Sequence, residues 1–155
     1  MRTTALLAGL ALAAFTFTAE AQQRPDYGPA IDIDAAKRIA EGVLEEYQNN
    51  NWNVAVAVVD KHGFLVYFER MENTQTASID IAVGKAKTAA MYRRTTRVFM
   101  DAINNTPATA TLGGIYASPG GIPIFADAKV IGGVGVSGVT GDQDEQCAEA
   151  GLAGL

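Results

Sequence analysis

Two pairs of short apolar runs, each pair joined by a turn, constrain the fold of this chain more than any other feature. The first pair, 54–59 and 64–69, flanks Asp60-Lys61-His62-Gly63, and the second pair, 122–125 and 130–136, flanks Asp127-Ala128-Lys129. Apolar runs rich in β-branched residues on either side of a few turn-forming residues predict β-hairpins. Because the strands of a hairpin pair antiparallel, the chain is expected to build an antiparallel sheet rather than parallel strand and helix units.

Helical spacing of apolar residues surrounds the two hairpins. It predicts a first helix, capped by Asp32 or Asp34 and ended by Asn49-Asn50-Asn51, and further helices over 77–91, from Thr95 or Thr96 to about 103, and over 142–152. Residues 104–121 lack periodicity and contain two Gly-Gly pairs, so we expect a long loop, and such loops are often functional. The fold class predicted from this order is α/β, of the α+β type, with helices that flank an antiparallel sheet of two hairpins.

Length and composition set the class of protein. The chain has 155 residues, of which 48% are hydrophobic and 19% are charged. That length fits one domain, and the balance is typical of a globular protein rather than a disordered one. The formal net charge is −5. We therefore do not expect nucleic acid as a partner, because phosphate binding needs a basic face.

The first 21 residues have the pattern of a secretory signal peptide. Arg2 precedes a 13-residue apolar run, 5–17, which is followed by Ala19-Glu20-Ala21. The run is shorter than the roughly 20 residues of a membrane span, and no basic stop-transfer cluster follows, so we expect cleavage near Ala21 rather than an uncleaved anchor. The expected organisation is then a signal peptide over 1–21, a flexible leader over 22–30 and one domain over 31–155. The protein would be periplasmic or secreted, with no stable membrane insertion after cleavage.

A single cysteine bears on how an exported chain of this size is stabilised. Cys147 cannot form an internal disulfide, so stability must come from the core, with oligomerisation as an expected aid. The thiol itself is expected to be a small buried hydrophobic group rather than a reactive site.

Five basic residues and no acidic residue lie between positions 85 and 97, namely Lys85, Lys87, Arg93, Arg94 and Arg97. Such a cluster is suited to hold the carboxylates of a ligand, because arginine offers two parallel donors. A solvated helix face, or a subunit contact paired with the acidic first helix, explains the same cluster equally well.

Residues 133–138 match the G-x-G-x-x-G pattern of dinucleotide-binding proteins, but their context argues against that function. The pattern needs a strand, helix and strand unit and an acidic residue about 20 positions further on, and the sequence ends at Leu155. Backbone amides between Ser137 and Asp142 are suited to hold a small anion at a helix start. A tight turn made by glycines is the alternative.

His62 is the one histidine, and it lies in the predicted turn of the first hairpin. A lone histidine cannot build a zinc site, but it suffices as an axial ligand of haem iron. Tyr92, Tyr116, Met91 and Met100 are the other conceivable iron ligands, although residues of these types more often serve only in packing. Patterns typical of serine hydrolases and phosphate-binding loops are absent from the sequence.

Five segments, taken in order, form a pattern along the chain. They are Val58-Val59-Asp60-Lys61-His62-Gly63-Phe64-Leu65-Val66, Lys85-Ala86-Lys87-Thr88-Ala89-Ala90, Gly120-Gly121-Ile122-Pro123-Ile124, Val130-Ile131-Gly132-Gly133-Val134-Gly135-Val136-Ser137-Gly138 and Asp144-Glu145-Gln146-Cys147-Ala148-Glu149-Ala150-Gly151. This pattern resembles the GlcG/HbpS-like family, a haem-binding and haem-degrading family related to the C-terminal domain of PduO-type proteins. The resemblance covers about residues 31–155, and the last two segments together are its most specific part.

The resemblance implies a profilin-like, three-layer domain that forms homo-oligomers and binds haem. It implies that the glycine-rich segments and the basic helix form parts of a pocket, and His62 is retained as the metal-ligand candidate. Tyr92-Arg93-Arg94-Thr95-Thr96 is similar to a family stretch in which proline commonly stands at the position of Thr95. The cofactor-binding residues implied are Tyr92, Arg93, Arg94, Thr96, Tyr116, Gly120 and Gly121.

Three functions are open at this point. The first is an exported haem-binding protein that acts in haem storage, sensing or degradation, with Arg93 and Arg94 paired with the propionates. The second is an enzyme for a small carboxylated metabolite, held by amides near Gly138, with Asp60, Asp144 or Tyr116 for proton transfer. The third is an oligomeric accessory or sensory partner protein.

Overall fold

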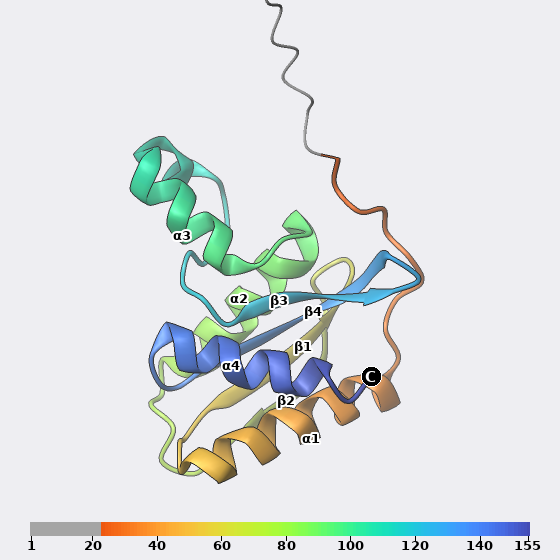
Figure 1. Cartoon of the computed structure of the whole chain (residues 1–155), viewed down its shortest axis with the longest axis vertical. Coiled ribbons are helices and arrows are strands. Elements are labelled where there is room, and N and C mark those ends of the chain that lie inside the picture. The colour runs from red at the N-terminus through yellow and green to blue at the C-terminus, as the bar shows by residue number, and fades with distance from the viewer. Residues whose placement is uncertain (1–22) are drawn as a thin grey trace, which may run out of the picture.

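A computed structural model describes residues 23–155 of the chain (Figure 1). The expected signal peptide and its cleavage site lie outside the described residues. The elements follow one another as α1 (Ile33–Asn50), β1 (Ala55–Asp60), β2 (Leu65–Arg70), α2 (Ser78–Tyr92), α3 (Thr96–Asn105), the 3-10 helix η1 (Pro107–Thr111), β3 (Gly121–Ala126), β4 (Lys129–Ser137) and α4 (Gly141–Leu152). This order confirms the predicted α+β class.

The two predicted hairpins join into one four-stranded antiparallel sheet with the strand order β2-β1-β4-β3. The hairpins meet in the middle, where β1 pairs with β4 and Val56 lies opposite Val136. The turn between β3 and β4 uses left-handed backbone at Asp127 and Ala128, with φ of 48° and 59°. Two consecutive left-handed residues match the right-handed twist of the flanking strands.

Helices α1 and α4 cover one face of the sheet (Figure 1). Alternate residues of β1, Val56 and Val58 among them, point into this layer and pack against α1 residues such as Ile39 and Val43. The buried Cys147 of α4 belongs to the same core. Asp32 caps α1 by accepting a hydrogen bond from the amide of Ala35 at 2.8 Å, which satisfies one of the free amides of the first turn.

Helix α2 covers the opposite face and lies unusually close to the sheet. The β1 residues Ala55 and Ala57 pack here against alanines of α2, so β1 is buried on both faces. A Cβ atom on Gly133 or Gly135 of β4 would collide with backbone oxygens of α2. The glycines of the G-x-G-x-x-G pattern therefore seat a helix against a strand, and the domain has the three layers that the resemblance implied.

The segment expected to be a leader is attached to the sheet from Asp26 onward. β1 ends at Asp60, opposite Gly132, whereas β4 extends past this point. The free backbone of Val130 there donates to the Asp26 carbonyl at 2.8 Å and accepts from the Gly28 amide at 2.9 Å. Lys61 adds a bond from its ammonium group to the Gly28 carbonyl at 2.6 Å. Unpaired strand backbone thus explains why these residues are held.

Helix α3 and η1 project from the body of the domain (Figure 1). The predicted loop over 104–121 therefore contains the last residues of α3 and the short 3-10 helix. Within residues 23–155, the structure contains no helix that is both long and apolar enough to cross a membrane.

Candidate functional site

The outward face of α2 carries a cavity of about 390 Å³. The loop after η1 forms its second wall, with Gly114 and Tyr116, and the α2 wall includes Gly84 and Lys87. The Tyr116 ring lies directly on Gly84, where a Cβ atom would collide with the ring. Gly84 thus allows the aromatic ring to pack closely on the helix, and 38% of Tyr116 remains exposed.

Thr88 of α2 fixes this loop to the helix. Its buried hydroxyl donates to the Gly84 carbonyl at 2.8 Å and accepts the Tyr116 amide at 2.9 Å. One turn further on, the Tyr92 hydroxyl donates to the Gly113 carbonyl at 2.8 Å. Tyr92, predicted to bind a cofactor, therefore holds the loop that shapes the cavity, and its ring packs edge-on against Phe99.

The cavity is lined by the charged side chains of Asp80 and Lys87 as well as by Val83. Met91, near the end of α2, is 54% exposed. The turn between β1 and β2 lies beside it, because a Cβ atom on Gly63 would be 3.1 Å from the Met91 sulfur. This turn is rigid, since the Asp60 carboxylate accepts the amides of His62 and Phe64 at 2.8 and 2.9 Å. His62 is exposed in this turn, whereas Asp60 has a structural role there.

His62 does not belong to a protein-built metal centre in the described part of the chain. Residues 23–155 contain no group of three or more histidine, cysteine, aspartate or glutamate side chains placed to hold a metal ion. An isolated imidazole of this kind can contribute one ligand to a metal that arrives in a cofactor, but it cannot hold a free ion alone.

Arg93 and Arg94 lie where α2 ends and α3 begins. The Arg93 guanidinium lies 5.0 Å from the centre of the Tyr27 ring, and that of Arg94 lies 5.3 Å from the Phe99 ring. Both Nε atoms are buried and lack a hydrogen-bond partner, and no other buried side-chain nitrogen or oxygen in residues 23–155 shares this property. Burial, and then the charge of Arg24, lower the pKa of Arg94. An unsatisfied buried donor in each of two consecutive arginines is unusual, because buried polar groups are normally hydrogen-bonded.

Two other members of the basic cluster, Lys85 and Arg97, are paired with acidic residues and stabilise the fold. The Lys85 ammonium donates to Asp144 at 2.7 Å and to the Val136 carbonyl at 3.0 Å, and both side chains are buried. Arg97 bonds Asp142 and Glu145 of α4. Among the described residues, Lys87, Arg93 and Arg94 form no ion pair, so these three remain for a ligand.

Thr96, Gly120 and Gly121 were also predicted to bind a cofactor, and the structure places all three inside the fold. The buried Thr96 hydroxyl accepts the Gly121 amide at 2.9 Å, which ties α3 to β3. A Cβ atom on Gly120 would lie 2.7 Å from that of Asp144. All three are buried, and their role in cofactor binding stays a prediction.

The amides between Ser137 and Asp142, considered above as an anion site, are occupied by the chain itself. Asp144 accepts the Val139 amide at 3.1 Å, and Thr140 and Gln143 form a capping box at the start of α4. A Cβ atom on Gly138 would collide with the Asn53 carbonyl. The glycines make a tight turn, and the proposed carboxylate site of the enzyme hypothesis is closed, with Asp144 paired to Lys85.

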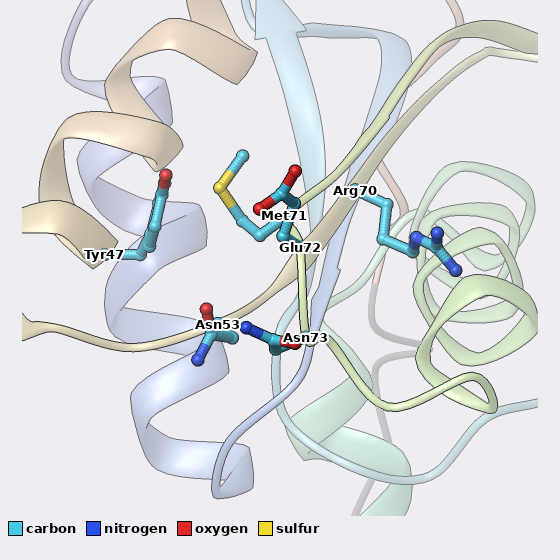
Figure 2. A pocket seen from close by; sticks show the side chains of 6 residues that line it. All are labelled: Tyr47, Asn53, Arg70, Met71, Glu72 and Asn73. Carbon is cyan, nitrogen blue, oxygen red and sulfur yellow. The ribbon is translucent and has the colours of Figure 1, made fainter.

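A second cavity, of about 490 Å³, lies where α1 and β2 end. Figure 2 shows the Asn53 and Asn73 side chains next to each other, whereas Arg70 is directed away from them. No residue predicted from the sequence lines this cavity.

Sequence reasoning missed Arg24, Tyr27 and Phe99. Tyr27 and Arg24 lie in the segment treated as a leader, and Phe99 supplies a buried ring under Arg94. The aromatic and arginine residues just before the first helix were the available signal. The partners that Tyr27 and Pro25 have on α2 and at its end are 63 or more positions away in the sequence, so no local pattern joins them.

The fold and the site together define a small α+β domain with a cavity on the outward face of α2 and an arginine pair at the end of that helix. Residues 31–153 match the family described as "Haem degrading protein HbpS-like". The chain is 42% identical over 104 residues to protein GlcG of Escherichia coli strain K12, which covers 66% of this chain and 77% of GlcG. The chain belongs to the HbpS-like family, as its sequence resemblance predicted.

Solved structures agree with this assignment. A double-mutant form of Streptomyces reticuli HbpS superposes with a TM-score of 0.78 at 29% identity, over 95% of this chain and 99% of that one. The PduOC domain, solved as a complex with haem, superposes with a TM-score of 0.75 at 25% identity, over 81% and 95% of the two chains.

Proposed function

We propose that this chain is an exported haem-binding protein, with the haem on the outward face of α2. The observation that carries the proposal is the pair of consecutive arginines Arg93 and Arg94, which form no ion pair among the described residues and follow the exposed Met91 at the end of α2. Haem combines an apolar ring with two carboxylates, so it needs these two kinds of surface side by side. The description of the family and the haem complex of PduOC support the same ligand.

The residues present fit such a ligand. Arg93 and Arg94 would hold the propionates, since guanidinium groups bind carboxylates through two parallel hydrogen bonds. Met91 and the ring of Tyr116 would contact the porphyrin, and Lys87 lies between them on α2. Bound haem would supply an iron whose axial position accepts nitrogen, oxygen or sulfur. His62, Tyr116 and Met91 are the exposed candidates for that position.

A second copy of the chain would complete the site. The α2 cavity of about 390 Å³ is open on one side, whereas ligand sites usually bury most of the ligand surface. Phe64, which is 72% exposed, and Tyr116 give this face the apolar character of a subunit contact. We therefore propose a homo-oligomer in which the haem lies at or near the interface. Export rests on the pattern of residues 1–21.

The test is a haem titration of the chain from Gln22, followed by absorbance and by molar mass from light scattering. We expect a saturable shift of the Soret band at a fixed ratio of haem to subunit. Changing Arg93 and Arg94 together to Gln should weaken binding by tenfold or more, because each charge-assisted hydrogen bond contributes about 1.5–3 kcal/mol.

The matched control is the adjacent basic pair Lys37 and Arg38, both exposed on α1 on the other side of the sheet. Changing this pair to Gln alters the net charge equally and should leave haem affinity unchanged. A flat titration of a folded oligomer would refute haem binding, and equal effects of the two double variants would refute the assigned role of Arg93 and Arg94.

A further inference from the structure

We infer that Asp80 makes the α2 cavity selective for flat ligands that carry their carboxylates on one side only. Asp80 and Lys87 both line this cavity, so a ligand with carboxylates at both ends would meet a like charge at Asp80. The inference rests on the proposed function for the identity of haem as the natural ligand, and it adds a specificity-determining residue to that site.

The first observation is the order of charges along the outward face of α2. The helix contributes Asp80, Val83, Gly84 and Lys87 to the cavity, and residues spaced in this way lie on one face of a helix. Asp80 and Lys87 are two turns apart, or about 10.5 Å along the helix axis. Val83 and Gly84 lie between them. The cavity wall therefore has opposite charges at its two ends and an uncharged middle.

The second observation is that the protein neutralises neither of these charges. Among residues 23–155, the Asp80 carboxylate and the Lys87 ammonium group form no ion pair and no side-chain hydrogen bond. Both residues are exposed. Lys85 and Arg97, by contrast, are each paired with an acidic residue of α4. The fold thus uses other charges for its own stability and leaves these two at the cavity.

The third observation is that the opposite wall of the cavity is held in place. The Thr88 hydroxyl accepts the Tyr116 amide at 2.9 Å and lies 3.3 Å from the Gly114 carbonyl. The Tyr116 ring packs on Gly84, which is four positions after Asp80 and three before Lys87. A flat apolar ligand held by this ring therefore has one of the two charges towards each of its ends.

These three observations select a ligand by its pattern of charge. Haem carries both of its carboxylates on one edge. The basic residues Lys87, Arg93 and Arg94 lie towards the C-terminal end of α2, whereas Asp80 is in its first turn. Carboxylates are favoured at the basic end and disfavoured at the other, and repulsion of this kind is a common source of specificity. Asp80 thus sets the direction of the ligand as well as its class.

The experiment compares haem with iron coproporphyrin, which has carboxylates on both sides of its ring, by absorbance titration. The variant is Asp80→Asn. The matched control is Asp34→Asn, because Asp34 is an exposed acidic residue in the first turn of α1. Both changes remove one negative charge and one favourable interaction with a helix N-terminus, but only Asp80 lines the cavity.

We expect the unmodified chain to bind haem more tightly than iron coproporphyrin. Asp80→Asn should bind iron coproporphyrin about fivefold more tightly, the size expected for one interaction between exposed charges, and should change haem affinity less than twofold. The gain should disappear in 1 M salt, where the screening length is about 3 Å. Equal ratios of the two affinities in Asp80→Asn and Asp34→Asn would overturn the inference.

A second pair of probes keeps this inference distinct from the proposed function. The compound para-(aminomethyl)benzoate has an ammonium group and a carboxylate at opposite ends of one ring, whereas terephthalate has a carboxylate at each end. The first should raise the melting temperature of the unmodified chain more than the second, and Asp80→Asn should remove the difference.

The two pairs of probes divide the outcomes. When haem binds, the ratio of haem to iron coproporphyrin affinity decides the inference, and an unchanged ratio in Asp80→Asn leaves the proposed function standing alone. When haem does not bind, the proposed function fails and the benzoate pair decides the inference. A difference between the two compounds that depends on Asp80 would then support it, and no difference would overturn it.

Discussion

The buried pair of Lys85 and Asp144 permits a demanding test of the energetics of this fold. The two side chains are 1% and 3% exposed, and their charged atoms are 2.7 Å apart. At an effective dielectric constant of about 20, that distance corresponds to an attraction of about 6 kcal/mol. The cost of burying both charges offsets much of it, so the pair adds little net stability.

Changing Lys85 to Met leaves the Asp144 carboxylate buried with only backbone amides, those of Val139 and Gly138, as hydrogen-bond donors. Removing one member of a buried pair costs about 3–5 kcal/mol, which for a domain of this size lowers the melting temperature by roughly 10–15 °C. Burial raises the pKa of Asp144, and Lys85 opposes that rise. Without Lys85 the pKa of Asp144 in the folded state lies further above its pKa in the unfolded state. The variant therefore keeps its free energy of unfolding below pH 4 and loses stability as the pH rises through the folded-state pKa of Asp144.

Urea unfolding at pH 7 and pH 4 measures this effect. The penalty of Lys85→Met should be larger at pH 7 than at pH 4, and adding Asp144→Asn should restore much of the loss. Lys87→Met, two positions further along the same helix and exposed, should change stability by no more than about 0.5 kcal/mol. A penalty below about 1 kcal/mol at pH 7, against the 3–5 expected, or one that grows towards pH 4, would refute the reasoning.

Three further predictions concern packing, the thiol and capping. Gly135→Val, whose side chain would meet the α2 backbone, should lower the free energy of unfolding in urea by about 3 kcal/mol or more. Gly113→Ala, whose added Cβ atom would have no atom within 4 Å, should leave stability unchanged. A small loss of stability in Gly135→Val would contradict the close packing. Burial raises the pKa of the Cys147 thiol to about 12 from 9.0. At pH 8 a disulfide reagent should therefore label the native chain at least about a thousandfold more slowly than the unfolded chain, and equal labelling rates would be inconsistent with burial. The protonated thiol should also contribute to the free energy of unfolding below pH 9, and this contribution should be lost towards pH 12. Thr140→Ala should cost about 1 kcal/mol in the same unfolding assay through loss of the capping box, and an unchanged midpoint would show that the cap is dispensable.

The sequence predicted the hairpins and helices well because their signals are local. The periodicity of Val54 to Val59, the turn at Asp60 and the alanine stripe of α2 all lie within short windows, and the resemblance to the family supplied the arrangement of layers. The sequence did not show that the segment before α1 is attached to β4. That contact depends on Val130 lying beyond the end of β1, which only the strand register reveals.

The candidate site was harder to predict for the same reason. Arg93 and Arg94 stood out as a basic pair, but Lys85 and Arg97 were equally basic and proved to be paired with α4. Thr96, Gly120 and Gly121 are brought together by the fold, yet the bond between Thr96 and Gly121 is internal. Which charges are satisfied depends on residues that are 45 or more positions apart, so composition and spacing cannot decide it.

The packing of α2 on β4 separates two functions of this helix, its attachment to the sheet and the presentation of side chains to a ligand. The inner side of the helix is positioned by alanines against Gly133 and Gly135, so backbone shape alone sets its height above the sheet. The outward side chains, including Lys87 and Met91, are exposed. Substitutions along that row can change which ligand is bound while the frame beneath keeps its geometry, so the domain can acquire new binding specificities at little cost in stability.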